Sequence, residues 1–178
     1  MKKSYSIFLT FALIVSAMFI SCASTPTVST YDIDVQYDSE TPAVSLDVVP
    51  SWGSNWIYGD GFSGFSCTFK NNTDRTVRIV WDQSSLNYNG NSYVPFLDGQ
   101  KYMNADSPMS PAAITKNNSI TKAVYSSAQP YYESGKYGGW RMLPMKSNTV
   151  ELVFCVRTET GEQFVTATVN AVMAQTDK

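Results

Sequence analysis

The stretch at residues 64–82, GFSCTFKNNTDRTVRIVWD, contains the two clearest strand patterns in the chain. In each half, large apolar side chains recur at every second residue, and a period of two places alternate side chains on opposite faces of a strand. The apolar members are Phe65, Cys67 and Phe69, then Val77, Ile79 and Trp81. Residues 71–74 between them, NNTD, have side chains that bond their own backbone in turns. The stretch therefore predicts two half-buried strands joined by a polar turn.

Other strand patterns lie on both sides of this stretch, at residues 43–49, 86–94, 119–125, 150–157 and 163–172. The first is expected to stop at Pro50. Asn89–Gly90 predicts a tight hairpin, and residues 159–161 predict the turn of a closing hairpin. One short strand is expected near residues 112–115, inside an otherwise loop-like segment at 95–118. With 13% aromatic and 16% charged residues and no amphipathic helix pattern, the chain is predicted to be all-β.

Two segments rich in glycine and aromatic residues, 51–64 and 126–147, are predicted to be loops. Their aromatic residues are candidates for a binding surface: Trp52, Trp56, Tyr58, Tyr131, Tyr132, Tyr137 and Trp140. The competing interpretation is that these rings close over the end of the core, because most aromatic side chains of small domains are buried. Burial is the expectation for Trp81, and also for Trp56 and Trp140.

The first 22 residues have the pattern of an export signal. Lys2 and Lys3 precede an apolar run at residues 5–20, which is too short and wrongly flanked for a membrane-spanning helix. The run ends in FISC at residues 19–22, which resembles the lipobox of bacterial lipoproteins in the relaxed form of spirochaetes, with Phe in place of the usual Leu. The resemblance implies lipidation of Cys22 and a membrane-anchored location in the cell envelope, at the outer membrane or cell surface. An ordinary secretory peptide cut nearby and an uncleaved anchor are the alternatives.

This leader divides the chain into a signal peptide (1–21), a lipidated N-terminus with a flexible tether (22–40), one β-sandwich domain (41–173) and a tail (174–178). Residues 23–30, ASTPTVST, are too small and polar to offset the entropy of folding. Residues 31–60 carry six acidic side chains and no Lys or Arg. We expect them to keep this segment solvated near a lipid surface; a calcium site is the alternative, but the spacing matches no calcium-binding loop.

The pattern of residues 65–81 resembles the connection between strands B and C of immunoglobulin-like sandwiches in bacterial extracytoplasmic proteins. The resemblance implies a single antiparallel sandwich in which the chain crosses between the two sheets at the Asn-rich turn. Cys67, Trp81 and Cys155 also resemble the immunoglobulin Cys–Trp–Cys set. Val153, however, stands where the tyrosine corner of that family would be.

Cys67 and Cys155 are predicted to remain unpaired. Cys67 belongs to the inward face of its strand, whereas the inward set of residues 150–157 leaves Cys155 on the outer face; that inward set is Val150, Leu152, Phe154 and Val156. A disulfide needs Cβ atoms about 3.5–4.5 Å apart, which side chains on opposite sides of a sheet cannot reach. A bulge that turned Cys155 inward would allow the bond, with a stabilisation of roughly 4 kcal/mol.

The residue types that common enzymes need are missing from the sequence. The chain has no histidine, which removes the usual general base, zinc ligand and nucleophile partner. It also has no Cys-x-x-Cys motif, no Gly-rich phosphate loop and no evident carboxylate pair. We therefore predict no enzymatic activity, no cofactor and no metal site.

Removing the leader leaves 11 basic and 15 acidic residues, a net charge of −4, which argues against a nucleic-acid partner. The leading hypothesis is a non-catalytic, lipid-anchored envelope protein that acts as a protein-binding or adhesion-type module. A carbohydrate- or peptidoglycan-binding module that uses the loop aromatics is the first alternative. An envelope structural or assembly lipoprotein is the second. Partner identity, membrane leaflet and oligomeric state stay open.

Overall fold

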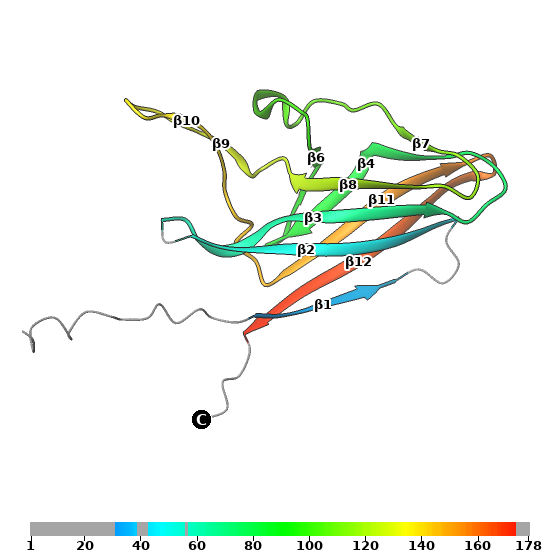
Figure 1. Cartoon of the computed structure of the whole chain (residues 1–178), viewed down its shortest axis with the longest axis horizontal. Coiled ribbons are helices and arrows are strands. Elements are labelled where there is room, and N and C mark those ends of the chain that lie inside the picture. Colours follow the sequence, from blue (N-terminus) through cyan, green and yellow to red (C-terminus); the bar gives the residue numbers. More distant parts are fainter. Residues whose placement is uncertain (1–30, 39–42, 56, 174–178) are drawn as a thin grey trace, which may run out of the picture. The chain divides into compact units, whose positions relative to one another are not determined.

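The computed structural model describes residues 31–38, 43–55 and 57–173. In this part of the chain, the regular structure consists of strands β1 to β12 and one short 3-10 helix, η1 (Tyr102–Asn104). Two antiparallel sheets lie face to face, and a separate hairpin projects at one end (Figure 1). The fold is therefore all-β and β-sandwich-like, which confirms the predicted class.

The larger sheet has the order β1-β12-β11-β4-β5, with β7 also paired to β4. Its strands are β1 (Tyr31–Tyr37), β4 (Val77–Tyr88), β5 (Asn91–Tyr93), β7 (Ala112–Ile114), β11 (Thr149–Thr158) and β12 (Gly161–Met173). The smaller sheet has the order β2-β3-β8-β6, with β2 (Val44–Asn55), β3 (Gly59–Asn71), β6 (Pro95–Leu97) and β8 (Ser119–Ser126). Strands β9 (Pro130–Glu133) and β10 (Gly139–Met142) form the separate hairpin.

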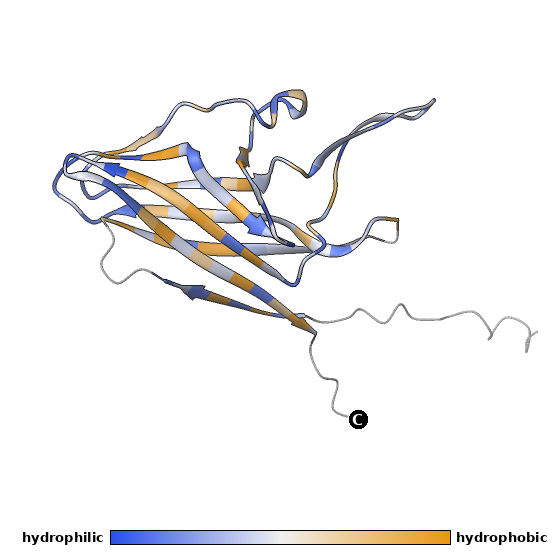
Figure 2. Ribbon diagram, turned by 180° about the vertical axis from the view of Figure 1, so that it is seen from behind, coloured by the Kyte–Doolittle hydropathy of each residue, from blue (hydrophilic) through white to orange (hydrophobic). Residues whose placement is uncertain are grey.

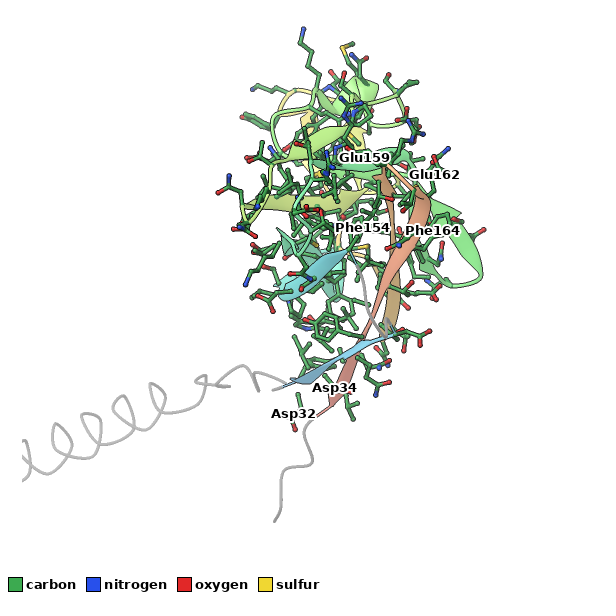
Figure 3. The ribbon with its side chains drawn as sticks, turned by 90° about the vertical axis from the view of Figure 1, so that its right-hand side faces the viewer. Asp32, Asp34, Phe154, Glu159, Glu162 and Phe164 are labelled. Carbon is green, nitrogen blue, oxygen red and sulfur yellow. The ribbon has the colours of Figure 1, made fainter. Side chains whose placement is uncertain are left out.

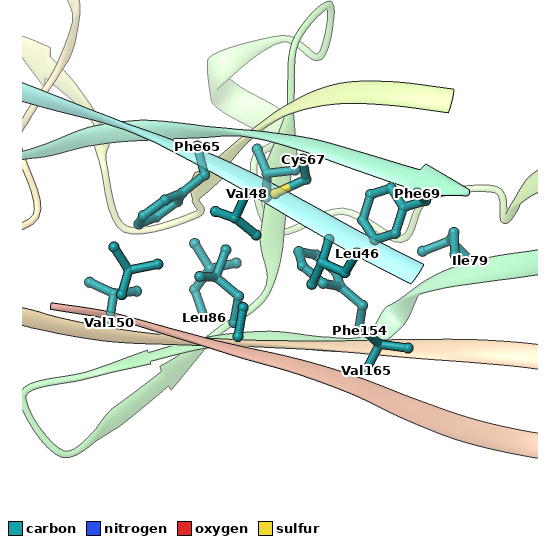
Figure 4. Packing of buried hydrophobic residues seen from close by; sticks show 14 of the residues in the cluster. Leu46, Val48, Phe65, Cys67, Phe69, Ile79, Leu86, Val150, Phe154 and Val165 are labelled. Atoms are coloured by element: carbon teal, nitrogen blue, oxygen red, sulfur yellow. The ribbon is translucent and has the colours of Figure 1, made fainter. Parts of the chain in front are cut away.

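The core lies between the two sheets, where their alternating apolar residues meet, as the orange bands along the strands show (Figure 2). All the residues predicted to face inward in residues 64–82 are buried: Phe65, Cys67, Phe69, Val77, Ile79 and Trp81. Figure 4 shows side chains of β3 directed toward those of β4 and β11. Phe154 meets Phe69 and Trp81 edge to face, with ring centroids 4.9 and 6.2 Å apart. Such pairs add to the stabilisation from burial.

The Asn-rich turn carries the chain from β3 in the smaller sheet to β4 in the larger one, as predicted. Its centre is the buried side chain of Asn71. The Asn71 Nδ2 donates to the carbonyls of Arg75 (2.6 Å) and Ile114 (3.0 Å), and Oδ1 accepts the Thr73 N–H (2.9 Å). One amide therefore shapes the turn and ties it to β7.

Several predicted local features are confirmed. Asn89 and Gly90 join β4 to β5 with positive φ angles of 51° and 73°, which are the dihedrals of a type I′ turn. The strand expected near 112–115 is β7, and the closing hairpin is β11–β12. Strand β6 and helix η1, in the same segment as β7, were not predicted.

Strand boundaries and both aromatic loops were predicted wrongly. Residues 31–37, assigned to the tether, form β1, in which partly buried Tyr31, Ile33 and Val35 alternate with exposed residues. Strand β2 continues past Pro50 because it is an edge strand, where a missing N–H breaks no pairing. The predicted loop at 51–64 is mostly the outer part of the β2–β3 hairpin, and the one at 126–147 contains β9 and β10.

The glycines that suggested a loop at 51–64 include one that a close approach requires. Phe62 and Met145 exchange backbone hydrogen bonds of 3.2 and 2.9 Å. A Cβ at Gly61 would collide with the Met145 carbonyl, so only glycine fits beside this bridge. Gly61 is therefore needed for the close approach of two backbone segments, and it does not mark an irregular loop.

Cys67 and Cys155 are both free, and the predicted faces are confirmed. Cys67 is part of the core, whereas Cys155 lies on the outer side of β11, opposite Val80 of β4 and Phe164 of β12. Cys155 is nevertheless buried, because these neighbours cover it. The two thiols are therefore separated by the sheet that carries Cys155.

A bulge does occur beside Cys155, but it leaves the alternation of β11 intact. Val153 pairs with Ser85 while Cys155 pairs with Val80, so the extra residues are all on β4. Ser84 fills the gap, since its Oγ accepts the Cys155 N–H at 3.0 Å. The irregular strand is β4, and Cys155 keeps its outward direction.

The buried thiols of Cys67 and Cys155 make the free energy of unfolding depend on pH in the alkaline range. Burial raises the pKa of Cys67 far above its usual range, with the Asp47 carboxylate adding to it, and burial also raises the pKa of Cys155. Unfolded thiols lose their protons near about pH 8.5, so above this pH the unfolded chain releases these protons more readily than the folded chain does. We expect the free energy of unfolding to fall as the pH rises from about 8.5 to 10, by up to about 1.4 kcal/mol per pH unit from Cys67, with a further contribution of the same sign from Cys155. Urea unfolding across this range measures the slope, and an unchanged slope in Cys67→Ala would contradict the assignment.

Candidate binding surface

One buried amide, Gln129, holds the base of the β9–β10 hairpin to the sandwich. Its Oε1 accepts the Ser126 N–H (2.8 Å), and its Nε2 donates to the carbonyls of Leu143 (2.9 Å) and Ser63 (3.3 Å). The backbone of Leu143 donates in turn to the Gln129 carbonyl (2.9 Å). Because Ser126 ends β8, Leu143 follows β10 and Ser63 lies on β3, the amide joins three segments at the point where the hairpin leaves the sandwich.

The hairpin and η1 together present one cluster of exposed rings, which we call the aromatic surface: Tyr102, Tyr132 and Trp140. Trp140 lies between the other two, with its ring centroid 5.6 Å from Tyr132 and 6.1 Å from Tyr102. Tyr132 and Trp140 pair across β9 and β10, which places them on one face of the hairpin. Tyr102, Tyr132 and Trp140 remain 38%, 59% and 41% exposed.

The aromatic surface rests on a small apolar layer on the outer side of the smaller sheet. Tyr102 packs against Phe96 with centroids 5.7 Å apart, and Phe96 also lies 6.0 Å from Tyr125 of β8. Phe96, in contact with both rings, is only 2% exposed. The Tyr125 ring lies close over Gly64, where any Cβ would collide with it. These contacts fix the position of Tyr102.

A pocket of about 330 Å³ opens beside Tyr102. It is lined by Phe96, Asp98, Gly99, Gln100, Tyr102, Tyr125 and Met142. Asp98 is exposed, whereas Gln100 Oε1 accepts the Leu97 N–H at 2.8 Å. The pocket therefore combines aromatic walls with one free carboxylate.

Cations flank the rings on the hairpin. Arg141 Nε lies 3.2 Å from Glu133 Oε2, and both side chains are close to half exposed, so the ion pair contributes little to stability. The Lys136 ammonium lies 5.4 Å from the centre of the Tyr137 ring, within the range of a cation–π contact. The hairpin thus combines exposed rings with positive charge.

The structure brings four of the predicted aromatic residues together and separates the others. Tyr131, Tyr132, Tyr137 and Trp140 all belong to the β9–β10 hairpin, where they are exposed. Trp140 was predicted to be buried, and that prediction was wrong, because the hairpin projects from the sandwich (Figure 1). The predicted burial of Trp81 is confirmed at 1% exposure.

The remaining candidates lie on the β2–β3 hairpin or outside the described residues. Trp52 packs between Tyr31 and Phe62, with ring centroids 4.4 and 4.8 Å away, so it belongs to the edge of the core. Tyr58 is half-buried near the hairpin turn. Trp56 lies outside the described residues, as does Cys22.

Sequence reasoning missed Tyr102 and its neighbour Met103, which is 70% exposed. Both lie in the long segment between β6 and β7, which has no periodic pattern to indicate where side chains point. The only available signal was the length of that segment, since long irregular segments of compact domains are often functional.

The acidic residues of β1 lie on its exposed face. Asp32 and Asp34 project from the edge of the larger sheet, and Asp34 accepts a hydrogen bond from Gln36 at 2.9 Å (Figure 3). Among the described residues, no group of three or more acidic or cysteine side chains is placed to hold a metal ion. None of the described residues belongs to a helix with the length and hydropathy of a membrane span.

A comparison with protein-family models, with curated proteins and with solved structures finds no match to this chain. The function is therefore inferred from the sequence pattern and from the geometry of the described residues.

Proposed function

We propose that this protein is a non-catalytic, lipid-anchored protein of the cell envelope, at the outer membrane or cell surface, that binds another protein through its aromatic surface. The pattern of residues 1–22 supports the anchor. The crossing from β3 to β4 and the buried Trp81 support an immunoglobulin-like form of the sandwich.

The observation that carries the proposal is the joint exposure of Tyr102, Tyr132 and Trp140 on a surface that the fold holds in place. Tyr and Trp are the side chains most often found at the energetic centre of protein interfaces. Because Tyr102 sits on buried Phe96 and Gln129 holds the hairpin, these rings lose little conformational freedom on binding. The surface is preorganised for a partner.

The tilt of the rings favours a protein over a sugar. Trp140 is inclined by 57° to Tyr102 and by 69° to Tyr132, so the three rings form a ridged surface and no flat stacking face. Apolar side chains of a protein fit between such ridges. Met103 adds a flexible apolar side chain, a type common on protein-binding surfaces.

A carbohydrate or peptidoglycan strand is the second candidate, and the pocket beside Tyr102 is the observation that favours it. A sugar that stacked on Tyr102 would place its hydroxyl groups near the exposed Asp98 carboxylate. This arrangement uses one ring only. The protein hypothesis uses the whole aromatic surface.

Photo-crosslinking in intact cells tests the protein hypothesis. Replacing Tyr132 by p-benzoylphenylalanine should give a discrete crosslinked protein. The same replacement at Phe164, which is exposed on β12 away from the hairpin, should not. Trp140→Ala should weaken the crosslink from position 132 by about tenfold or more, as expected for a central interface residue. Equal crosslinks from both positions would contradict protein binding here, and glycan-array binding lost in Trp140→Ala would favour the carbohydrate candidate.

The anchor is tested separately. Metabolic labelling with a fatty-acid analogue should mark the wild-type protein and leave Cys22→Ser unlabelled, because Cys22 is the residue that the lipobox pattern assigns to acylation. Cys22→Ser should also move the protein from the membrane fraction to the soluble fraction. Equal labelling of both proteins would rule out lipidation at this cysteine.

A further inference from the structure

The tip of the β9–β10 hairpin has the composition of a segment at the boundary between lipid and water. Residues 134–138, SGKYG, join the two strands and include no acidic residue. Tyr137 is 80% exposed, and Lys136 lies beside its ring. Tyrosine and tryptophan rings, with lysine nearby, are the side chains that settle at the level of lipid headgroups.

This tip lies at the same end of the sandwich as the first residue of β1. Figure 1 shows the β9–β10 tip and the start of β1 toward one end of the sandwich, with the β11–β12 turn at the other, and Figure 2 shows the same arrangement from behind. Contacts place the base of the hairpin at this end as well, since Tyr31 of β1 packs on Trp52 and Trp52 packs on Phe62. Phe62 in turn pairs with Met145, which follows β10.

The chain between the predicted lipidated cysteine and β1 is short. Residues 23–30 are eight residues, and a fully extended chain covers at most about 3.5 Å per residue, or about 28 Å in all. Strand β12 alone has 13 residues and extends over about 43 Å. The tether is therefore shorter than the sandwich, and Tyr31 is the residue held nearest to the anchor.

We propose that the tip of the β9–β10 hairpin, through Tyr137 and Lys136, contacts the lipid surface in which Cys22 is anchored; this inference rests on the lipid anchor of the proposed function. The anchor keeps the tip at a high effective concentration near the bilayer, so a contact of one or two side chains is enough. The Tyr137 ring carries most of the contact, because Asp32 and Asp34 of β1 oppose an anionic surface and offset the attraction of Lys136 to it. With its tip on the lipid, the hairpin presents the aromatic surface to partners in the same membrane.

Quenching by brominated lipid tests this orientation on the full lipidated chain, reconstituted in phosphatidylcholine vesicles. Tyr137→Trp places an indole at the tip. Phe164→Trp is the matched control, because Phe164 is also exposed but lies on β12 near the β11–β12 turn, at the opposite end. Brominated phosphatidylcholine should quench roughly half or more of the emission that Tyr137→Trp adds, and little of that added by Phe164→Trp.

Flotation of the vesicles separates the two ways in which the inference fails. Protein that does not float with the vesicles overturns the anchor, and the inference with it. Protein that floats, but whose added indole at position 137 is not quenched, overturns the lipid contact and leaves the anchor intact. Stronger quenching at position 164 than at 137 would show that the opposite end faces the lipid.

Discussion

Replacing Phe154 by Ala is expected to lower the free energy of unfolding by about 3–5 kcal/mol, the usual result of removing a fully buried Phe ring. Phe154 has no exposed surface and lies at the centre of the core, with its ring against Phe69 of β3 and Trp81 of β4. Its removal therefore weakens contacts both within the larger sheet and between the two sheets. The neighbours lie on paired strands and cannot collapse fully into the cavity.

Phe164 provides the matched control, because it is the same residue type on the neighbouring strand β12 and is 57% exposed (Figure 3). Phe164→Ala should cost less than about 1 kcal/mol, with part of that cost due to exposure of Cys155 beneath the ring. Urea unfolding of both variants at neutral pH gives the comparison. If both substitutions lowered the free energy of unfolding by similar amounts, Phe154 would not face the core while Phe164 faces solvent.

Replacing Gln129 by Ala is expected to lower the free energy of unfolding by about 2–4 kcal/mol and to release the β9–β10 hairpin from the sandwich. The substitution removes the hydrogen-bond partner of the buried Ser126 N–H and of the partly buried Leu143 and Ser63 carbonyls. The Ser126 N–H in particular loses its hydrogen bond without regaining water. Because the amide joins β8, β3 and the end of the hairpin, the hairpin should become sensitive to limited proteolysis before the rest of the sandwich unfolds.

Gln129→Glu tests whether the donating Nε2 of the amide, and not only the accepting Oε1, stabilises the fold. A carboxylate still accepts the Ser126 N–H but has no N–H to donate, and it would face the Leu143 and Ser63 carbonyl oxygens. We expect Gln129→Glu to be at least as damaging as Gln129→Ala, whereas Gln36→Ala, at an exposed glutamine, should change stability by less than about 0.5 kcal/mol. A hairpin that stays protease-resistant in both Gln129 variants would show that its base is held by other contacts.

The residues of the core could be predicted because a strand has a strict period of two. Phe65, Cys67, Phe69 and Trp81 were assigned inward on that basis alone, and the same alternation placed Cys155 outward. The turn at Asn71 and the hairpin at Asn89–Gly90 were predictable for a related reason, since these side chains favour particular backbone dihedrals wherever they occur. All these features depend on residues close together in the sequence.

Strand ends and strand pairing were harder to predict. The sequence around Pro50 indicates a break, yet β2 continues there because its free edge lies at the boundary of the smaller sheet. Glycines at 51–64 indicate a loop, yet Gly61 is required where the backbones of Phe62 and Met145 meet. The bridge between Phe62 and Met145 joins residues more than 80 positions apart in the sequence. No local sequence pattern predicts a contact of this kind.

The sequence by itself determined the all-β class, most of the inward-facing residues, the separation of the two thiols and the candidate aromatic residues of the β9–β10 hairpin. Only the tertiary structure decided that Trp52 belongs to the edge of the core while Trp140 is exposed, and that Tyr102 joins Tyr132 and Trp140 in one surface. The physical reason is that burial of a ring depends on what packs against it. The exposure of the Trp140 ring follows from the position of the hairpin, because the hydrogen bonds of Gln129 hold the hairpin at the end of the sandwich and away from its core.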